Sequence, residues 1–225
     1  MTKKATTPHK QHPYRLILAS QSPRRKKLLR HLLQNIDTSV RNFDIIPADI
    51  DETRFKNESA LQYTRRMALE KGLAVSSRLP PSPPDAGTSH KTVILSADTI
   101  VVLGKTIYPK PKDHKHAAQI LTALSGKVHR VITAYALVII RSGERQRVIT
   151  RTGHDTSRVH FYHLTKKQIT DYSCKKEPMD KAGAYAVQGA GRAFIHSIEG
   201  SYHNVMGLPT EKIGPLLEKI LNSRQ

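Results

Sequence analysis

Acidic side chains are scarce in this sequence, yet three of them lie within four residues. Asp49, Asp51 and Glu52 follow a short apolar segment, whereas the whole chain of 225 residues contains only 18 Asp and Glu. Carboxylates combined with substrate phosphates are the usual environment of Mg²⁺ in proteins. The cluster therefore indicates a metal-binding loop, with an ordinary loop or a helix N-cap as the alternative interpretation.

A further carboxylate, Asp98, follows the apolar run 92–97, which predicts a buried strand that ends at Asp98. Ligands of open α/β sheets bind outside the carboxyl ends of strands. A carboxylate at that place is suited to hold Mg²⁺ or to accept a proton from water. An aspartate that only shapes a turn is the competing interpretation.

The segment 20–25, Ser-Gln-Ser-Pro-Arg-Arg, joins a predicted strand to a predicted helix. Ser22 suits the N-cap of that helix and Pro23 its first position. The free N–H groups and the dipole at a helix N-terminus favour an anion. Because the dipole disfavours cations there, one interpretation of Arg24 and Arg25 is an anion bound between them. A capped helix with solvated arginines is the alternative.

Two lysines are candidates for further phosphate contacts. Lys110 lies between two prolines, and this stiff backbone would hold its ammonium in place at a reduced entropic cost. Lys71 comes late in the second predicted helix and is within plausible reach of a phosphate. A surface turn and a solvated helix lysine remain open as alternatives for these two residues.

Small residues dominate the segment 180–189, where they allow another backbone or a ligand to approach closely. Gln188 follows an apolar stretch and precedes a glycine, so its amide is a candidate for ligand recognition. An edge-strand polar residue is the alternative. By contrast, Cys174 lies in a polar stretch without a motif, and the twelve histidines are scattered.

Strands and helices alternate in the first half of the chain, and strands cluster in the second half. This order predicts an α/β fold with a mixed sheet. We expect strands at 14–19, 43–47, 92–97, 128–140, 147–162, 183–187 and 193–198, a hairpin over 100–108, and helices from Pro23 and over 59–77, 113–124, 165–174 and 210–222.

Residues 1–13 contain no acid and few apolar groups, which predicts a disordered basic tail ahead of a single domain over 14–225. No run reaches the roughly 18 apolar residues that a membrane span needs. The N-terminus lacks the apolar core of a secretory signal, and the single cysteine excludes an intrachain disulfide. These features favour a cytoplasmic protein without a membrane partner.

The formal net charge is +19, which attracts polyanions of any kind. The basic residues are spread through the chain, and no zinc-finger, RNA-binding or helix-turn-helix motif accompanies them. Because of the charge and the basic tail, a nucleic-acid-associated, nucleotide-binding protein without turnover is kept as the alternative to an enzyme.

Taken together, the ordered segments resemble the Maf family over residues 15 to 221. The resemblance is carried by 18–25, Asp51-Glu52, Glu70-Lys71, 96–102, 110–113, 124–126, 180–189 and 200–209. Two departures are Pro109, where the family usually has glycine, and Gly72, where alanine is usual. The resemblance implies two lobes around a cleft, an architecture related to inosine triphosphatase, and a homodimer. It also implies a house-cleaning enzyme that removes unwanted nucleotides by hydrolysis between the α- and β-phosphates.

The same resemblance assigns roles to individual residues. It implies that Asp98 is the proton acceptor or metal-linked base. It also implies that Glu52 binds either the divalent metal ion, Mg²⁺ or Mn²⁺, or a water molecule. It places Ser22, Arg25, Lys71 and Lys110 along the phosphates. Its three specificity positions correspond to Arg24, Thr99 and Gln188, a set similar to the dTTP/UTP subgroup and unlike the one that acts on 7-methyl-GTP.

Hydrogen-bond chemistry supports the pyrimidine assignment independently. Uracil and thymine present the acceptor O4 beside the donor N3–H, and a glutamine amide offers the matching donor and acceptor. Guanine presents two adjacent donors, which a glutamate matches better. A buried mismatch leaves polar groups unpaired, so Gln188 alone has the capacity to discriminate between the bases.

Overall fold

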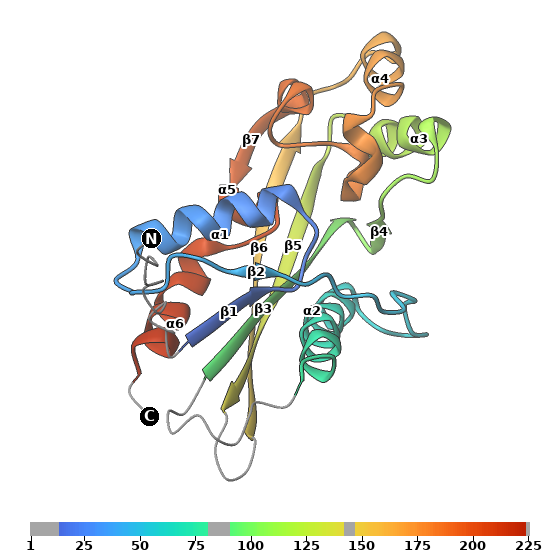
Figure 1. Cartoon of the computed structure of the whole chain (residues 1–225). Coiled ribbons are helices and arrows are strands. Elements are labelled where there is room, and N and C mark those ends of the chain that lie inside the picture. The colour runs from blue at the N-terminus through green and yellow to red at the C-terminus, as the bar shows by residue number, and fades with distance from the viewer. Residues whose placement is uncertain (1–13, 81–90, 142–146, 224–225) are drawn as a thin grey trace, which may run out of the picture.

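Figure 1 presents the computed structural model, which describes residues 14–80, 91–141 and 147–223. The basic tail expected over 1–13 lies outside the described residues, as does most of the proline-rich segment 79–91.

A seven-stranded mixed sheet forms the centre of the protein, with the strand order β2-β1-β3-β5-β6-β7 and with β4 paired to β3. Strand β1, next to the edge strand β2, runs parallel to β2 and β3, whereas all other pairs are antiparallel. The strands are β1 Tyr14–Leu18, β2 Asp44–Ile45, β3 Lys91–Leu103, β4 Thr106–Tyr108, β5 Val128–Arg141, β6 Arg147–Phe161 and β7 Ile195–Glu199. The predicted α/β class with a mixed sheet is confirmed.

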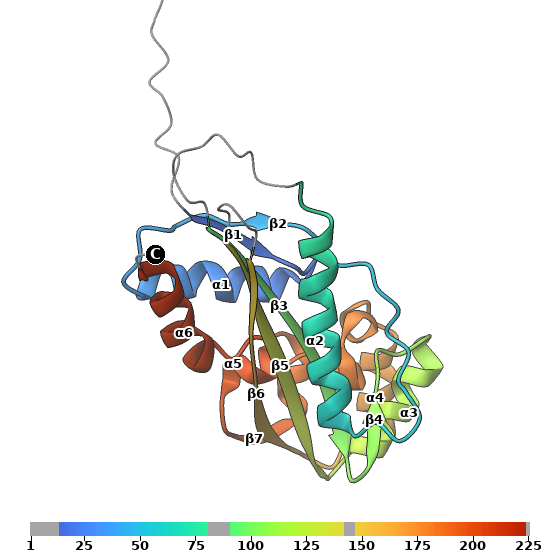
Figure 2. The same cartoon turned by 90° about the horizontal axis from the view of Figure 1, so that it is seen from below.

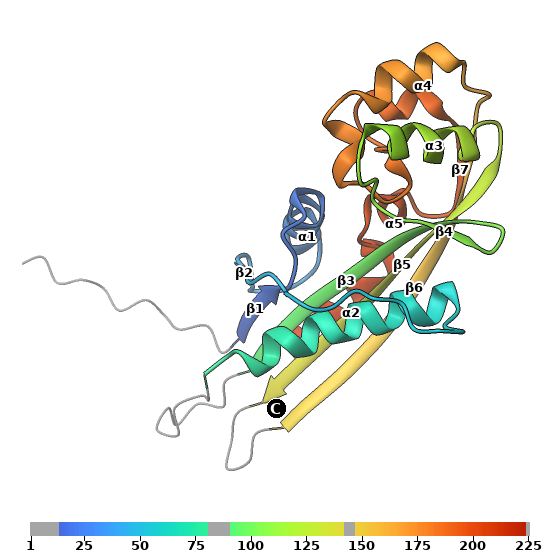
Figure 3. The same cartoon turned by 90° about the vertical axis from the view of Figure 1, so that its right-hand side faces the viewer.

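The helices cover both faces of this sheet. Figure 3 shows α2 along one face of the long strands and α1 on the other, and the view in Figure 2 agrees. The short helices α3 and α4 gather at one end of the sheet, away from β1, β2 and α6 (Figure 1). The helices are α1 Pro23–Asn35, α2 Ala60–Ser77, α3 His114–Leu124, α4 Lys166–Ser173, α5 Tyr202–Met206 and α6 Thr210–Asn222, with 3-10 turns at Glu177–Asp180, Ala182–Ala184 and Ala190–Phe194.

Local sequence signals explain where four of the helices begin. The side chains of Ser22, Ser59, Asp113 and Thr165 each accept a hydrogen bond from a backbone N–H in the first turn that follows. Such caps satisfy donors that have no partner inside the helix. The leucines of α1 lie on one buried face, with Leu29 and Leu33 fully shielded from solvent. Each helix start predicted from a cap is therefore confirmed.

Gly72 allows α2 to approach the sheet closely. A Cβ at this position would lie 2.8 Å from Oγ of Ser96 and 2.9 Å from Cγ2 of Val138. The alanine that is usual at this place would clash with both side chains, so the glycine is explained by the local packing. The hydroxyl of Ser96 also donates to the carbonyl of Ala68, which fixes the helix against the strand at 2.6 Å.

Two strand predictions need correction. Asp98 does not end its strand, because β3 continues without a break from Lys91 to Leu103 and pairs with β5 almost throughout. Residues 183–187 do not form a strand, because Gly183 and Ala184 have φ values of +73° and +57°, which no strand accepts. The hairpin of β3 with β4 and the strand β7 are confirmed, whereas helix α5 was not predicted.

Within the described residues, no helix combines the length and the apolar character needed to cross a membrane.

Candidate active site

A gap in the sheet leaves one edge of the central part of β3 without a partner strand. On one side of β3, β1 pairs with 91–95 and β4 pairs with 101–103, so no described strand pairs with 96–100 there. Asp98 lies in the middle of this gap, opposite Ala134 of β5 on the other side. The carboxylate therefore lies beyond the carboxyl end of β1, even though it is in the middle of its own strand.

A cleft of about 750 Å³ opens at this gap. Its walls come from the β1–α1 turn, α2, β3, β4, the 3-10 segment around Asp180 and the end of α5. The family resemblance gives a role to nine residues, and eight of them line the cleft: Ser22, Arg24, Arg25, Glu52, Lys71, Asp98, Thr99 and Lys110. Side chains from distant parts of the chain thus meet at one place.

Lys71 joins the two principal carboxylates of the cleft. Its Nζ lies 2.7 Å from Oδ1 of Asp98 and 2.7 Å from Oε1 of Glu52. Helix α2 supplies the lysine, strand β3 the aspartate, and the loop between β2 and α2 the glutamate. Asp98 and Lys71 are largely shielded, with side chains 12% exposed each, whereas Glu52 is 53% exposed. The two carboxylates therefore converge on the ammonium of Lys71, where the buried part of the cleft meets its exposed rim.

The electrostatics of this cluster affect Glu52 and Tyr63. Burial tends to raise the pKa of Glu52, but the ion pair with Lys71 and the charges of Lys110 and Arg25 hold it below its ordinary value. Tyr63 lines the cleft and donates a hydrogen bond from its hydroxyl to the carbonyl of Glu52 at 2.9 Å. Burial, with the negative charges of Asp98 and Glu52, raises the pKa of Tyr63 to about 12, so this hydroxyl stays protonated.

Arg25 is held rigidly at the floor of the cleft. Its Nε donates to the carbonyl of Gly207 at 2.8 Å, and its two terminal nitrogens donate to Oγ of Ser20 and Oγ1 of Thr99 at 3.2 and 3.0 Å. Burial lowers the pKa of Arg25, although the Asp98 carboxylate opposes this effect. Since a guanidinium has five N–H donors, two remain for an anion in the cleft.

Thr99 is engaged by other side chains. Its hydroxyl accepts from Arg25 and lies 3.0 Å from Oγ1 of Thr133, which itself donates to the carbonyl of Asn204 at 2.8 Å. The Thr99 proton is therefore directed to Thr133. This arrangement gives Thr99 the task of orienting Arg25, in addition to lining the cleft.

Arg24 has a buried donor that no described group satisfies. Its Nε has no hydrogen-bond partner among the described residues, although it is shielded from solvent. Burial lowers the pKa of Arg24, and the nearby carboxylates of Asp180 and Glu177 oppose this effect. A buried N–H without a partner is unfavourable by about 1–3 kcal/mol, which favours an acceptor on a bound molecule.

Ser22 and Lys110 flank these arginines. The Oγ of Ser22 accepts from the backbone N–H of Arg25 at 3.4 Å, as an N-cap does, and its own proton remains available to a ligand. Lys110 is exposed and contributes positive charge toward Glu52. The carbonyl of Pro109 accepts from the N–H of Gly183 at 3.2 Å, which fastens the proline-lysine segment to the opposite wall.

Gln188 is the ninth residue to which the family resemblance gives a role, and it does not line the cleft. It is exposed, whereas its neighbour Val187 is a lining residue. The turn that carries Gln188 is fixed on both sides. Tyr172 accepts from the N–H of Ala186 at 3.1 Å and donates to Glu177, and Glu177 accepts from the backbone N–H groups of 190 and 191 at 3.2 and 3.1 Å.

The donors for a metal ion are limited in number. No group of three or more His, Cys, Asp or Glu side chains within the described part of the chain is arranged to hold a metal. Glu52 and Asp98 are the two carboxylates that converge, while Asp49 and Asp51 are not among the lining residues. Asp51 instead accepts the backbone N–H of Thr53 at 2.8 Å.

Several lining residues were not predicted from the sequence. Tyr63, Asp180 and Gly207 join the site, and Ser20 reaches Arg25. Tyr63 precedes Lys71 by eight residues on the predicted helix, which places both on similar faces, and this spacing was the available signal. No local pattern indicates that Gly207 would approach Arg25.

Comparison with known proteins gives consistent matches along the chain. The family model described as "Maf-like protein" matches residues 15–220. A dTTP/UTP pyrophosphatase of Yersinia pestis is 40% identical over 209 residues, which cover 93% of this chain and 94% of that protein. A dTTP/UTP pyrophosphatase of Clostridioides difficile is 39% identical over 204 residues, covering 91% and 94%. The crystal structure of a dITP/XTP pyrophosphatase of Mycobacterium abscessus overlays with a TM-score of 0.45 at 12% identity, covering 92% and 98%.

Proposed function

The chain belongs to the Maf family, and we propose that it hydrolyses pyrimidine nucleoside triphosphates such as dTTP and UTP to the monophosphate and pyrophosphate. The relatives cited above carry this activity in their names and align over more than nine tenths of the chain. The observation that carries the proposal is the convergence of Glu52, Lys71 and Asp98 beside a wall of cationic donors.

Binding of the triphosphate is supported by the cationic side of the cleft. Arg25 has two N–H donors left after its three protein contacts, and Lys110 adds an exposed ammonium. The Ser22 hydroxyl and the start of α1 lie beside them, where the helix dipole favours anions. Fixed donors of this kind stabilise the charge that develops on phosphate oxygens and on leaving pyrophosphate.

Asp98 is the residue best suited to accept the proton of the attacking water. Its Oδ1 is bound by Lys71, which leaves the second carboxylate oxygen available. Lys71, which also binds Glu52, holds the carboxylate of Asp98 in one orientation. Its surroundings shield it from bulk solvent, since Asp98 is only 8% exposed. A base held within reach of its proton contributes about 10²–10⁴-fold to a rate.

The residues at the rim fit a divalent cation. Two converging carboxylates together with triphosphate oxygens form the hard oxygen environment that Mg²⁺ and Mn²⁺ prefer. Glu52 and Asp98 would hold the ion, and the nucleotide and water would supply its other ligands. When bound, such an ion polarises phosphoryl oxygens and lowers the pKa of bound water.

Selectivity for the base is assigned to Arg24, Thr99 and Gln188. The unpartnered Nε of Arg24 is an open donor, and Thr99 orients Arg25. The amide of Gln188 matches the O4 and N3–H pattern of uracil and thymine. Because Gln188 lies outside the cleft lining on a turn that is fixed, this role requires that the base reach past Val187 to the amide.

The test is a panel of substrates. The purified protein is incubated with Mg²⁺ or Mn²⁺ and each of dTTP, UTP, CTP, GTP, ATP and 7-methyl-GTP, and pyrophosphate and orthophosphate are measured separately. The proposal expects pyrophosphate with dTTP and UTP as preferred substrates. Preference for a purine would retain the enzyme class and remove the specificity assignment. Absence of turnover, together with salt-dependent binding of RNA or DNA, would favour the nucleic-acid-associated alternative suggested by the +19 charge.

A further inference from the structure

The segment 51–58, which carries Glu52 to the cleft, has no apolar anchor of its own. Each of its residues is exposed except Glu58, and Phe55 as a whole residue is 61% exposed. No described helix or strand falls within it, and Asn57 adopts a left-handed turn with φ of +65°. Polar contacts from α2 must therefore determine where this segment lies.

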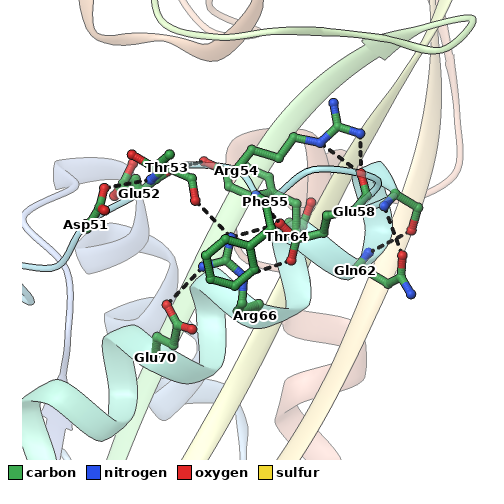
Figure 4. A network of polar contacts seen from close by, with 12 residues as sticks. Asp51, Glu52, Thr53, Arg54, Phe55, Glu58, Gln62, Thr64, Arg66 and Glu70 are labelled. Atoms are coloured by element: carbon green, nitrogen blue, oxygen red, sulfur yellow. Dashed lines mark hydrogen bonds and ion pairs between the residues drawn. The ribbon is translucent and has the colours of Figure 1, made fainter.

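Figure 4 shows these contacts, and Arg66 is at their centre. Its Nε and Nη2 bind the two carboxylate oxygens of Glu58 at 2.7 and 2.8 Å. Its Nη2 also donates to the carbonyl of Thr53 at 3.0 Å, the residue directly after Glu52. Its guanidinium stacks on the ring of Phe55, with 3.8 Å between Cζ and the ring centroid. One side chain thus contacts the beginning, the middle and the end of the segment.

The neighbouring contacts reinforce the same position. The Glu58 carboxylate accepts a hydrogen bond from the backbone N–H of Phe55 at 3.2 Å, which stabilises the turn between these two residues. Glu70 accepts from Nη1 of Arg66 at 3.2 Å, one helical turn further along α2. Tyr63 holds the carbonyl of Glu52 at 2.9 Å. Residues 63, 66 and 70 share one face of the helix, which explains how α2 binds the segment along its length.

This ion-pair network differs from an ordinary surface pair. An isolated exposed pair contributes little to stability, whereas a bidentate arginine–carboxylate pair within a network has a defined geometry. The side chains of Arg66 and Glu58 are only 17% and 9% exposed. A lysine cannot reproduce the planar fork or the stacking on Phe55.

We propose that Arg66 is a positioning residue, which holds Glu52 beside Lys71 and Asp98 by fastening segment 51–58 to α2. It acts through Thr53, Phe55 and Glu58 and is not among the residues that line the cleft. The inference rests on the proposed function only in that Glu52 serves hydrolysis. Loss of such an outer contact typically lowers activity or metal affinity by about 10- to 100-fold.

The test compares Arg66→Gln with Arg65→Gln. Arg65 is the adjacent, exposed arginine of the same helix, and no described side chain pairs with it, so the change of net charge is the same. The readouts are kcat and the Mg²⁺ concentration for half-maximal rate with UTP, the rate of amide hydrogen exchange over 51–58, and the thermal midpoint. A double-mutant cycle with Glu52→Gln and Glu52→Gln/Arg66→Gln measures the coupling between residues 52 and 66 in their effect on the rate.

We expect Arg66→Gln to lower the rate by about 10- to 100-fold and to speed exchange over 51–58, while Arg65→Gln changes neither. Arg66→Lys should restore only a small part of the rate. In the double variant the loss of rate should be close to that of Glu52→Gln alone, because without the Glu52 carboxylate the position of the segment no longer affects the rate. Additive losses, or unchanged exchange over 51–58, would overturn the proposal. If the wild-type protein hydrolyses no nucleotide, the proposed function fails, and the exchange data still decide whether Arg66 fastens the segment.

Discussion

The Nζ atom of Lys71 lies 2.7 Å from Oδ1 of Asp98, and it lies at the same distance from Oε1 of Glu52. A helix residue thereby joins a carboxylate in the middle of a strand to one on an exposed loop. The arrangement keeps two acidic groups close together without unbalanced charge. It also makes the position of both carboxylates dependent on one lysine.

Lys71→Gln should move the acid limb of the pH–rate profile to higher pH. The pKa of Glu52 lies below its ordinary value of 4.5 because the Lys71 ion pair outweighs the effect of burial. With that charge removed, burial and the nearby Asp98 carboxylate raise the pKa of Glu52, so the ionised form is lost at a higher pH. The measurement is kcat as a function of pH, with Lys112→Gln outside the cleft as the control.

The same pair predicts how stability depends on pH. Since the pKa of Glu52 is depressed in the folded protein, the pair contributes stability above the unfolded value near 4.5 and loses it as the pH falls through the folded value. Because Glu52 is about half exposed, the contribution is at most about 1 kcal/mol. The free energy of unfolding of wild type and Lys71→Gln should therefore converge below pH 4.5, and a constant difference would argue against the ion pair.

Asp98→Asn should retain the fold and lower kcat by about 10²–10⁴-fold. The amide still accepts a hydrogen bond from Lys71, so the packing around β3 is preserved, but it no longer takes a proton from water. Steady-state kinetics with UTP and thermal unfolding measure the two effects. Asp171→Asn, which removes a carboxylate from a surface pair with Lys167, serves as the matched control. Full activity of the Asp98 variant would exclude this residue as the base.

Gln188→Glu should lower the ratio of kcat/KM for UTP to that for 7-methyl-GTP by at least about tenfold. The carboxylate lacks the donor that O4 of uracil requires, and it matches the two donors of guanine. Gln34→Glu, at an exposed position of α1, controls for the added negative charge. An unchanged substrate profile would remove Gln188 from the specificity set.

Gly183→Ala should destabilise the protein more than Gly104→Ala does. Both glycines have positive φ values, +73° and +60°, so both alanines suffer similar backbone strain of about 1–2 kcal/mol. At 183 the added Cβ would also lie 2.8 Å from Cγ2 of Val101, whereas nothing lies within 4 Å at 104. Overpacking should add about 1–3 kcal/mol to the loss at 183. Urea unfolding measures the difference, and equal losses would show that Val101 yields without strain.

Local signals in the sequence were sufficient for most of the fold. The caps Ser22, Ser59, Asp113 and Thr165 locate the starts of their helices, and apolar runs locate β1, β3 and β5. The strand expected at 183–187 is wrong because a short apolar run alone does not distinguish a strand from a turn, and the positive φ of Gly183 decides for a turn. Helix α5 is only five residues long and gives too short a pattern to be recognised.

The site was predicted by residue type but not by arrangement. The sequence indicated Glu52, Lys71 and Asp98 as candidates, yet nothing local shows that one ammonium binds both carboxylates, since they come from a loop, a helix and a strand. The position of Asp98 beyond β1 depends on where β1 ends beside β3, which is a property of the sheet. The contacts of Arg66 could not be predicted for the same reason, because its partners gather only when the segment 51–58 folds onto α2.

The products formed from a single substrate test the central claim most directly. UTP is incubated with the wild-type protein and a divalent metal, and nucleotides and phosphates are separated and quantified over one time course. Hydrolysis between the α- and β-phosphates predicts UMP and pyrophosphate in equal amounts from the first time point, and a large loss of both with Asp98→Asn. The appearance of UDP with orthophosphate, or equal rates in the wild type and Asp98→Asn, would contradict the account.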